Sequence, residues 1–477
     1  MADRKLLIKL IIYISLILAV VAIPFAGIYV YATSLPATYK ESYYAALPLK
    51  YDRLYDVKGE KIIVIGGSSV AFGIDSKLVE QELGMPCVNF GLYAAFGLKP
   101  MLDLSEGAVG EGDIVIIAPE LSTQMYSDYV GYDYLLQACE QRSDMAFDLG
   151  LTYAAGFLSK FPSYIKDAGK LEKLGGLKVK GIYAAGSFDE YGDIVYERDV
   201  NVMDGMYSAD NLPEIKESMI SDEFAKMVND YARKAENKGA KVYFGFCPVN
   251  ELSAADISSE DRKAFVEKLD ESLDVEIIAS LEDHIFEAGY FYDSNFHTND
   301  AGTVLNTVLL INDIKRVTLE KMTATNIEIP KAPAATTEDE AIASGTWEGF
   351  KYVVTSSGVT ITGLSQEGLE LEKLEIPSQI ENYVVIKIDD KAFAGCCAKE
   401  IVLPESITVL SAGIFSEANE LAKVVLQSKT LPEVGNSLLN GANSDVKIYV
   451  PEELYSIYVT DYFWGAYADR LKSYGDN

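Results

Sequence analysis

The stretch Lys61-Ile62-Ile63-Val64-Ile65-Gly66-Gly67-Ser68-Ser69 decides the fold. A short apolar run that ends at two glycines is typical of a buried strand followed by a tight turn. Four further short apolar runs follow, at 87–90, 113–118, 241–246 and 275–278. Helical patterns separate them, at 75–83, 98–108, 259–271 and 299–314. Strands that alternate with helices predict an α/β fold with a doubly wound parallel sheet.

The amino-terminal end carries an apolar segment, from Leu10 to Ala32, that contains no charge. Its length suits a helix that crosses the roughly 30 Å of bilayer hydrocarbon. Three basic residues precede it and an acidic chain follows, which favours a cytoplasmic amino terminus. We therefore predict a single-pass protein of the cell membrane, with an N-terminal transmembrane helix and an extracytoplasmic bulk. A cleaved signal peptide, with Val30-Tyr31-Ala32 as the cleavage site, is the alternative.

Composition excludes several classes of function. The 477 residues carry a formal net charge of −31, and such a surface repels phosphate backbones, so we expect no nucleic-acid partner. The chain has two histidines, His284 and His297, which rules out a multi-histidine metal cluster. None of the five cysteines stands in a C-x-x-C motif. We expect no disulfide framework, no metal site and no cofactor.

Changes in composition along the chain predict four parts. Residues 1–36 form the cytoplasmic end and the transmembrane anchor, and residues 37–319 form the α/β domain. Within that domain, 133–235 is mostly helical, but no pattern assigns a structure to 181–210. Residues 320–346 have the Pro, Ala, Thr and acidic composition of a linker. Residues 347–477 form a separate repeat domain.

The repeat domain shows a recurring pattern. Ala392-Phe393 recurs 22 residues later as Ile414-Phe415, and Leu403-Pro404 recurs as Val450-Pro451 with Leu426 between them. A period of 20–29 residues with short apolar strands is typical of a small solenoid, in which stacked units supply the core. The aromatic segment 454–471 has helical spacing and would cap the array.

This segment resembles the bacterial leucine-rich repeats of the BspA-like surface-antigen type, over about 350–471. The matching residues are Ile376-Pro377, Ile388, 392–396, Leu403-Pro404, Ile407, Leu410 and Ile414-Phe415. The resemblance implies a cell-surface location and a protein or surface ligand of the repeats. A structural appendage without a partner is the alternative.

The turn after the first strand is the candidate site. Gly66-Gly67 followed by Gly73 gives neither the GxxxxGK[ST] nor the GxGxxG spacing of phosphate-binding loops. A serine on such a turn is exposed at the carboxyl edge of a parallel sheet, where α/β folds place their sites. Serine needs a base held by a carboxylate. The segment 293–300, between the last predicted strand and helix, supplies Asp293 and His297 at the same edge.

These residues resemble the SGNH/GDSL hydrolase superfamily over 60–316, and more narrowly its membrane-anchored branch of polysaccharide O-acetyltransferase and DltD-like proteins. The matching residues are 63–69, Asn89-Phe90-Gly91 and the late Asp–His pair. The resemblance implies an SGNH/flavodoxin-like fold with Ser68 as nucleophile, His297 as base and Asp293 as orienting acid. Gly91 would supply an oxyanion amide, and the pocket residues would be Gly67, Ser69, Asn89 and Glu120. Ser69 is the alternative nucleophile.

Two departures from that pattern stand in the sequence. Ala118-Pro119-Glu120-Leu121 occupies the place of the family's G-x-N-D block, so the asparagine oxyanion donor is missing. Losing one such donor typically costs about 10²–10³ in rate. The carboxylate also precedes the histidine by four residues instead of three. Asp293 reaches the histidine if the loop bulges, and Asp300 is the spare candidate.

The sequence therefore predicts a membrane-anchored serine esterase or O-acyltransferase that acts on acyl esters of a cell-surface glycan. The alternative is a non-enzymatic adhesion or binding protein, which would use the repeats for contact and the α/β domain as a degenerate scaffold. An accessory protein that works beside a membrane acyltransferase is a third class.

Overall fold

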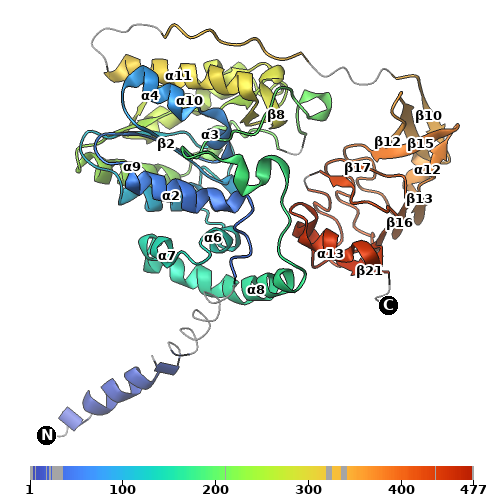
Figure 1. The fold of residues 1–477 in the computed structure, drawn as a ribbon, viewed down its shortest axis with the longest axis horizontal. Helices are drawn as coiled ribbons and strands as arrows, with labels where there is room; N and C mark the ends of the chain where they lie inside the picture. The colour runs from blue at the N-terminus through green and yellow to red at the C-terminus, as the bar shows by residue number, and fades with distance from the viewer. Residues whose placement is uncertain are drawn as a thin grey trace.

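The computed structural model describes residues 4–5, 7–17, 19–20, 23, 36–209, 211–318, 325–334, 341–435 and 437–474. Figure 1 shows an α/β body, coloured blue to yellow, beside a strand-rich body in orange and red. Within the described part of the chain, no helix is both long enough and apolar enough to span a bilayer. The predicted membrane segment includes positions 18, 21, 22 and 24–32, which lie outside the described residues. Single-pass anchoring therefore stays a prediction.

The central sheet of the α/β body has five strands in the order β2-β1-β3-β4-β6. Every neighbouring pair is parallel. Counted along the chain, this is the 2-1-3-4-5 order of doubly wound sheets of the flavodoxin type. The five strands are β1 (Ile62–Gly66), β2 (Cys87–Gly91), β3 (Ile114–Ile117), β4 (Lys241–Phe244) and β6 (Glu276–Ile277). The predicted parallel sheet is confirmed, and each predicted strand overlaps an observed one.

Alternate side chains of β1 enter two separate cores, because successive strand residues point to opposite faces. Ile63 and Ile65 pack into one core, and Ile62 and Val64 pack into the other. The helices of the first face are α2 (Ala46–Asp56), α5 (Leu98–Glu106), α9 (Asp222–Glu236) and α10 (Ser259–Ser272). Those of the second are α4 (Ser76–Leu83) and α11 (Asp300–Thr318). Both faces of the sheet are therefore covered, and α11 lies along one face (Figure 1).

Shorter elements complete this body. The helix α3 (Ser68–Gly73) directly follows β1. Three helices, α6 (Tyr132–Ala138), α7 (Ser143–Leu149) and α8 (Ala154–Lys173), form a layer below the sheet in the view of Figure 1. Two short pairs of strands add to them, β5 (Val249–Asn250) with β7 (Ile285–Phe286) and β8 (Phe291–Ser294) with β9 (His297–Thr298).

The sequence pattern of Leu281–Ala288 predicts a helix around His284, and this prediction is wrong. The chain makes only a 3-10 turn at Glu282–His284 and then enters β7. Pairing of β7 with β5 satisfies the backbone there, so tertiary contact overrides the local helical pattern. The ring of His284 is buried, and its Nδ1 lies 2.8 Å from the Ser280 carbonyl oxygen.

The repeat domain contains a ladder of parallel strands. The first residues of four successive strands, 373, 400, 423 and 447, are 27, 23 and 24 residues apart, which matches the predicted period. The ladder comprises β13 (Lys373–Glu375), β16 (Glu400–Leu403), β18 (Lys423–Leu426), β20 (Lys447–Val450) and β21 (Leu471–Ser473). These are leucine-rich-repeat-type strands.

A second sheet contributes to the same buried core as this ladder, and its main strands also follow one another in chain order. Its strands are β10 (Ala343–Trp347), β11 (Phe350–Val354), β12 (Val359–Leu364), β14 (Gln379–Ile380), β15 (Tyr383–Ile388), β17 (Val409–Leu410) and β19 (Glu433–Val434). A short helix, α12 (Gln366–Leu369), follows β12. The rings of Phe393 and Phe415 stack with centroids 6.2 Å apart. The recurring aromatic position therefore builds the buried interior of this domain.

The carboxyl-terminal end differs from the predicted capping helix at 454–471. The helix α13 (Glu452–Thr460) stops before Asp461, a 3-10 turn covers Trp464–Tyr467, and the chain then adds β21 to the ladder. Asp461 Oδ1 accepts hydrogen bonds from the backbone of Phe463 and Trp464. That side chain stabilises a turn in place of further helix.

Two glycine substitutions test the packing of α3 on the sheet. A Cβ at Gly91 would lie 2.2 Å from the backbone nitrogen of Ala71, whereas a Cβ at Gly169, within α8, would meet nothing within 4 Å. Gly91→Ala should lower the free energy of unfolding by about 1–3 kcal/mol. The matched Gly169→Ala should raise it by about 0.5–1 kcal/mol. Urea denaturation of both variants checks this, and equal stabilities would contradict the close packing.

Candidate active site

The candidate nucleophile is the first residue of α3. A Cβ at Gly66 would lie 2.4 Å from the Ala118 carbonyl oxygen, and a Cβ at Gly67 would lie 1.8 Å from Glu120 Oε2. Position 66 fits only glycine, because the backbone after β3 lies against the end of β1, whereas a Cβ at position 67 would displace the Glu120 carboxyl group. This crowding turns the chain sharply and leaves Ser68 half-buried at the carboxyl edge of the sheet.

Ser68, His297 and Asp293 form a continuous hydrogen-bonded chain. His297 Nε2 lies 2.8 Å from Ser68 Oγ, and His297 Nδ1 lies 2.8 Å from Asp293 Oδ1. His297 is 8% exposed. The three side chains thus have the mutual contacts of a nucleophile, a base and an orienting carboxylate.

The four-residue spacing from Asp293 to His297 is accommodated by an irregular hairpin. Strands β8 and β9 pair antiparallel, with Ser294 opposite His297, and their register shifts between Phe291 and Ser294. This irregularity brings the Asp293 carboxylate to the imidazole across the turn. Ser294, which stands three residues before the histidine, instead accepts a hydrogen bond from Asn211.

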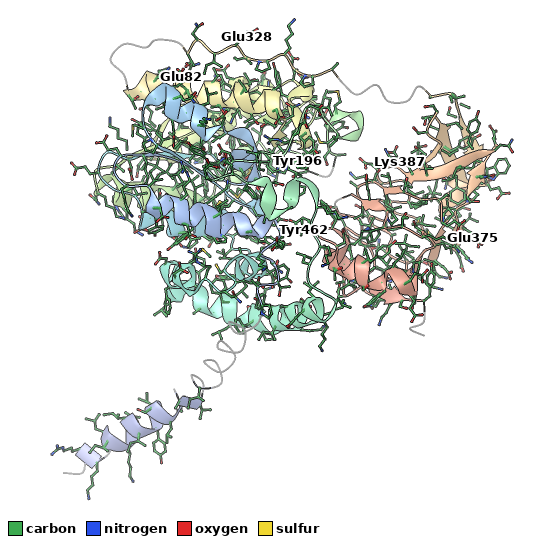
Figure 2. The ribbon with its side chains drawn as sticks, viewed as in Figure 1. Glu82, Tyr196, Glu328, Glu375, Lys387 and Tyr462 are labelled. Atoms are coloured by element: carbon green, nitrogen blue, oxygen red, sulfur yellow. The ribbon has the colours of Figure 1, made fainter. Side chains whose placement is uncertain are left out.

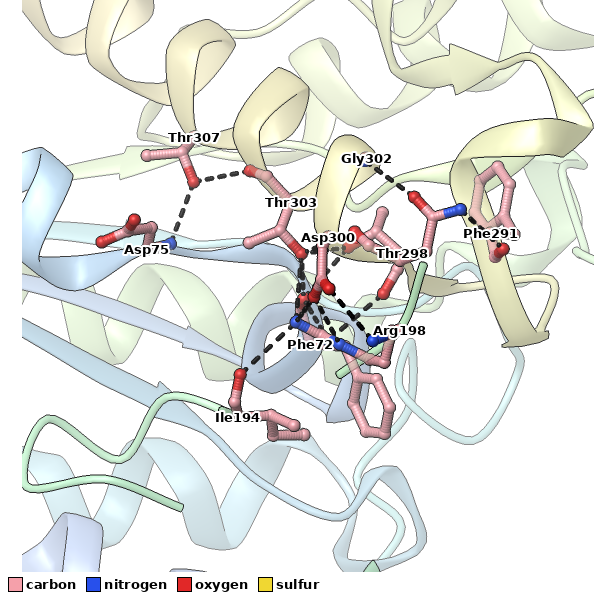
Figure 3. A network of polar contacts seen from close by, with 11 residues as sticks. Phe72, Asp75, Ile194, Arg198, Phe291, Thr298, Asp300, Gly302, Thr303 and Thr307 are labelled. Carbon is pink, nitrogen blue, oxygen red and sulfur yellow. Dashed lines mark hydrogen bonds and ion pairs between the residues drawn. The ribbon is translucent and has the colours of Figure 1, made fainter. Parts of the chain in front are cut away.

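A buried arginine joins the nucleophile helix to the histidine loop. The guanidinium of Arg198 donates to the carbonyl oxygens of Phe72, at 3.0 Å, and Thr298, at 3.2 Å (Figure 3). Asp300, the spare candidate for the orienting acid, pairs with this arginine at 3.3 Å. The ring of Phe72 stacks on His297 with centroids 3.9 Å apart. Helix α3 and strand β9 are therefore held together next to the triad.

The structure gives Gly91 and Asn89 different surroundings from those of an open oxyanion site. The backbone N–H of Gly91 donates to Asn89 Oδ1 at 3.0 Å. Asn89 is fully buried, and its Nδ2 donates to Val70 and Asp193. Lys50, also fully buried, donates to the same Oδ1. These groups connect β2 to α3, so the Gly91 N–H is not available to an oxyanion. Among the described residues, the backbone N–H of Ser68 has no acceptor and is available.

Glu120 lies directly against the nucleophile. Its Oε1 is 3.2 Å from Ser68 Oγ and accepts the backbone N–H of Ser69 at 2.7 Å. The carboxyl group is 3% exposed, and burial raises its pKa above the usual glutamate range. Ser69 is fully buried, so its hydroxyl is a poor alternative nucleophile. The carboxyl group of Glu120 occupies the space that a Cβ at Gly67 would fill.

Two aromatic residues that the sequence analysis did not identify lie beside the triad: Tyr183 contacts it directly, and Tyr462 packs behind Tyr183. The Tyr183 hydroxyl donates to Asp293 Oδ2 at 2.6 Å, and its ring stacks on Tyr462 with centroids 5.9 Å apart. Tyr462 belongs to the carboxyl-terminal cap of the repeat domain and lies where the two bodies meet (Figure 2). Tyr183 stands in the unassigned segment 181–210 and is one of 31 tyrosines. No local sequence signal marks it or Arg198.

Comparison with known proteins identifies the repeat domain. Residues 361–463 match the BspA type leucine rich repeat region, in six copies. A leucine rich cell surface protein from Faecalibacterium prausnitzii A2-165 is similar in structure, with 16% sequence identity and a TM-score of 0.18. The similarity covers 28% of this chain and 31% of that one, so the chain covers about a third of that protein's length. No curated protein matches the chain significantly.

The family match confirms the predicted leucine-rich repeats of the BspA type within residues 361–463. The comparisons contain no SGNH/GDSL match. The resemblance of the α/β domain to that superfamily therefore stays a prediction.

Proposed function

We propose that the α/β domain carries out serine-dependent ester chemistry, as an esterase or an O-acyltransferase. The observation that carries this proposal is the continuous chain from Ser68 Oγ through His297 to Asp293. An ordinary turn serine and a structural histidine have no reason to meet at hydrogen-bond distance across 229 residues of sequence. The comparisons neither support nor exclude this activity.

In the proposed reaction, Ser68 Oγ bonds to the acyl carbon while its proton passes to His297 Nε2. The π electrons of the carbonyl move to its oxygen, and the Ser68 backbone N–H is available to that oxyanion. When the carbonyl re-forms, the alcohol leaves with the proton from His297. Water or a second hydroxyl then attacks the acyl carbon of the acyl-enzyme while His297 Nε2 takes its proton. The bond from the acyl carbon to Ser68 Oγ breaks, and His297 returns the proton to Oγ. Asp293 stabilises the imidazolium that forms in each step.

The predicted location and the family resemblance together suggest a class of substrate. A chain anchored outside the membrane meets surface glycans, and O-acyl groups on sugar hydroxyls are esters that this chemistry makes or cleaves. An acyl-bearing cell-surface glycan is therefore the substrate class that we propose.

The family match favours a second function, adhesion or ligand binding at the cell surface. The repeat domain alone matches a known family, and such repeats present extended surfaces for partners. In this proposal the partner is a protein or glycan of another surface, and the α/β domain is a scaffold. Ser68 would then have no role in function.

Turnover of para-nitrophenyl acetate by the full-length chain distinguishes these proposals. Ser68→Ala and His297→Ala should each lower kcat/KM by about 10³-fold or more, because nucleophile and base act as one unit. The matched control is Ser163→Ala, which removes an exposed serine of α8 and should leave turnover unchanged. Equal turnover in all four proteins would contradict ester chemistry at Ser68 and leave the binding function.

A further inference from the structure

Glu120 stands in the place of the oxyanion asparagine, and its hydrogen bonds constrain its protonation state. His297 Nδ1 faces Asp293, which as a carboxylate can only accept, so Nδ1 carries a hydrogen. A neutral imidazole has one N–H, and therefore Nε2 is the acceptor of the single hydroxyl hydrogen of Ser68. The 3.2 Å contact between Ser68 Oγ and Glu120 Oε1 then lacks a hydrogen from the serine.

The missing hydrogen has one remaining source. The Ser69 N–H is already directed at Oε1, and it does not lie between the two oxygens. An ionised Glu120 would set a lone pair of Oε1 against a lone pair of Oγ whenever His297 is ready to act as a base. A protonated Glu120 donates through Oε1 to Oγ and satisfies every contact in the chain. The geometry of the active state thus requires the neutral acid.

The surroundings of Glu120 also disfavour the carboxylate. Its side chain is 3% exposed, and no lysine or arginine among the described residues forms an ion pair with it. Its Oε2 has no hydrogen-bond partner. Burial of an unpaired carboxylate is costly and raises its pKa. The titratable groups that face it are His297, Cys247, Tyr126 and Tyr43, of which only His297 can carry a positive charge.

Gly67 and Glu120 are linked by their packing. A Cβ at position 67 would lie 1.8 Å from Glu120 Oε2, so a side chain there would displace the carboxyl group from its present place beside Ser68. Glycine at 67 therefore leaves room for the observed position of Glu120.

We propose that Glu120 is a catalytic residue that acts as a neutral acid, with its hydrogen directed at Ser68 Oγ. It places a hydrogen-bond donor, instead of a second negative charge, beside the oxygen that bonds to the acyl carbon. The oxyanion itself keeps the Ser68 backbone N–H as its donor. Glu120 keeps its proton throughout, and the proton transfers of the reaction remain with His297. This inference rests on the proposed ester chemistry.

The protonation state of Glu120 predicts how turnover and stability change with pH. The pKa of Glu120 is raised in the folded protein, so ionisation at higher pH both removes the donor and adds a charge beside the oxyanion. Turnover should decline as the pH rises through the pKa of Glu120. The same shift favours folding at low pH, and that contribution to stability is lost as the pH rises through the folded-state pKa.

The test compares Glu120→Gln with Glu120→Ala in the full-length chain. Gln keeps the shape and the neutral charge, but the atom at the Oε1 position can then either accept the Ser69 N–H or donate to Ser68 Oγ. We therefore expect kcat to fall by about 10-fold and the decline at high pH to disappear. Ala removes the donor and should lower kcat by about 10²-fold. The matched control Glu140→Gln changes another largely buried carboxyl group with a raised pKa, and it should keep the high-pH decline. Melting temperatures of all variants verify folding.

A folded Glu120→Gln variant that keeps the decline at high pH would overturn the inference, because another group would then titrate. Infrared spectroscopy gives an independent readout at neutral pH: the carboxylic-acid C=O band should be present in the wild-type protein and weaker in Glu120→Gln. An unchanged band would equally overturn it. Activity retained in Ser68→Ala would refute the proposed function, whereas the infrared result addresses Glu120 by itself.

A second inference comes from the contact between the domains. Tyr183 donates to Asp293 Oδ2, the oxygen that His297 does not use. The ring of Tyr183 is held by two rings of the carboxyl-terminal cap, Tyr462 at 5.9 Å and Phe463 at 5.6 Å. The cap itself is fastened to the α/β body, since Lys170 Nζ donates to the Ala468 carbonyl oxygen at 3.0 Å.

We infer that Tyr183 is a positioning residue for Asp293 and that the repeat domain holds it in place through Tyr462. The repeat domain therefore influences the triad without contacting substrate. This coupling makes ester turnover depend on the docking of the two domains, and it also rests on the proposed ester chemistry.

Tyr183→Phe should lower kcat by about 10-fold with KM unchanged, because it removes only the hydrogen bond to Asp293. Tyr462→Ala should have a similar effect, and Tyr462→Phe, which keeps the ring, should restore turnover. The matched control Ile457→Ala changes an exposed residue of α13. Wild-type kcat in Tyr462→Ala, together with loss of turnover in Ser68→Ala, would overturn the coupling but leave the proposed function intact.

Discussion

The close approach of two strand ends is the constraint on which the candidate site depends. The segment after β3 lies so close to the end of β1 that Gly66 cannot carry a side chain, and Gly67 faces the carboxyl group of Glu120. This close approach forces the sharp turn into α3, leaves Ser68 at the sheet edge and places Glu120 against it. A buried arginine and the stacked ring of Phe72 then hold α3 to the histidine loop.

The sequence predicted the parallel sheet and the meeting of Ser68, His297 and Asp293, because both follow from local patterns and from the rule that the strand ends share an edge. It also predicted the repeat period, since stacked units repeat their core residues. The structure of the unassigned segment 181–210 could not be predicted from the sequence. Arg198 and Tyr183 act there through contacts with residues about a hundred positions away. Composition and periodicity carry no information about such contacts.

Two expectations failed for a shared physical reason. The helix around His284 and the long capping helix at 454–471 have helical spacing, yet strand pairing and a side-chain-stabilised turn satisfy the backbone instead. The pocket assignment of Gly91 shows a related limit. Its position next to α3 is as expected, but its N–H is directed at the buried Asn89. The local sequence pattern predicts where a residue lies in the fold. Its hydrogen-bond partner depends on the tertiary packing around it.

The central claim is that Ser68 is an activated nucleophile, and covalent labelling tests it without knowledge of the substrate. A fluorophosphonate reacts with a serine only when a neighbouring base accepts the hydroxyl proton. After incubation of the full-length chain, mass spectrometry of peptides should find the phosphonyl group on Ser68, and the label should disappear in His297→Ala. An unlabelled Ser68, or equal labelling in the presence and absence of the His297 imidazole, would contradict the account.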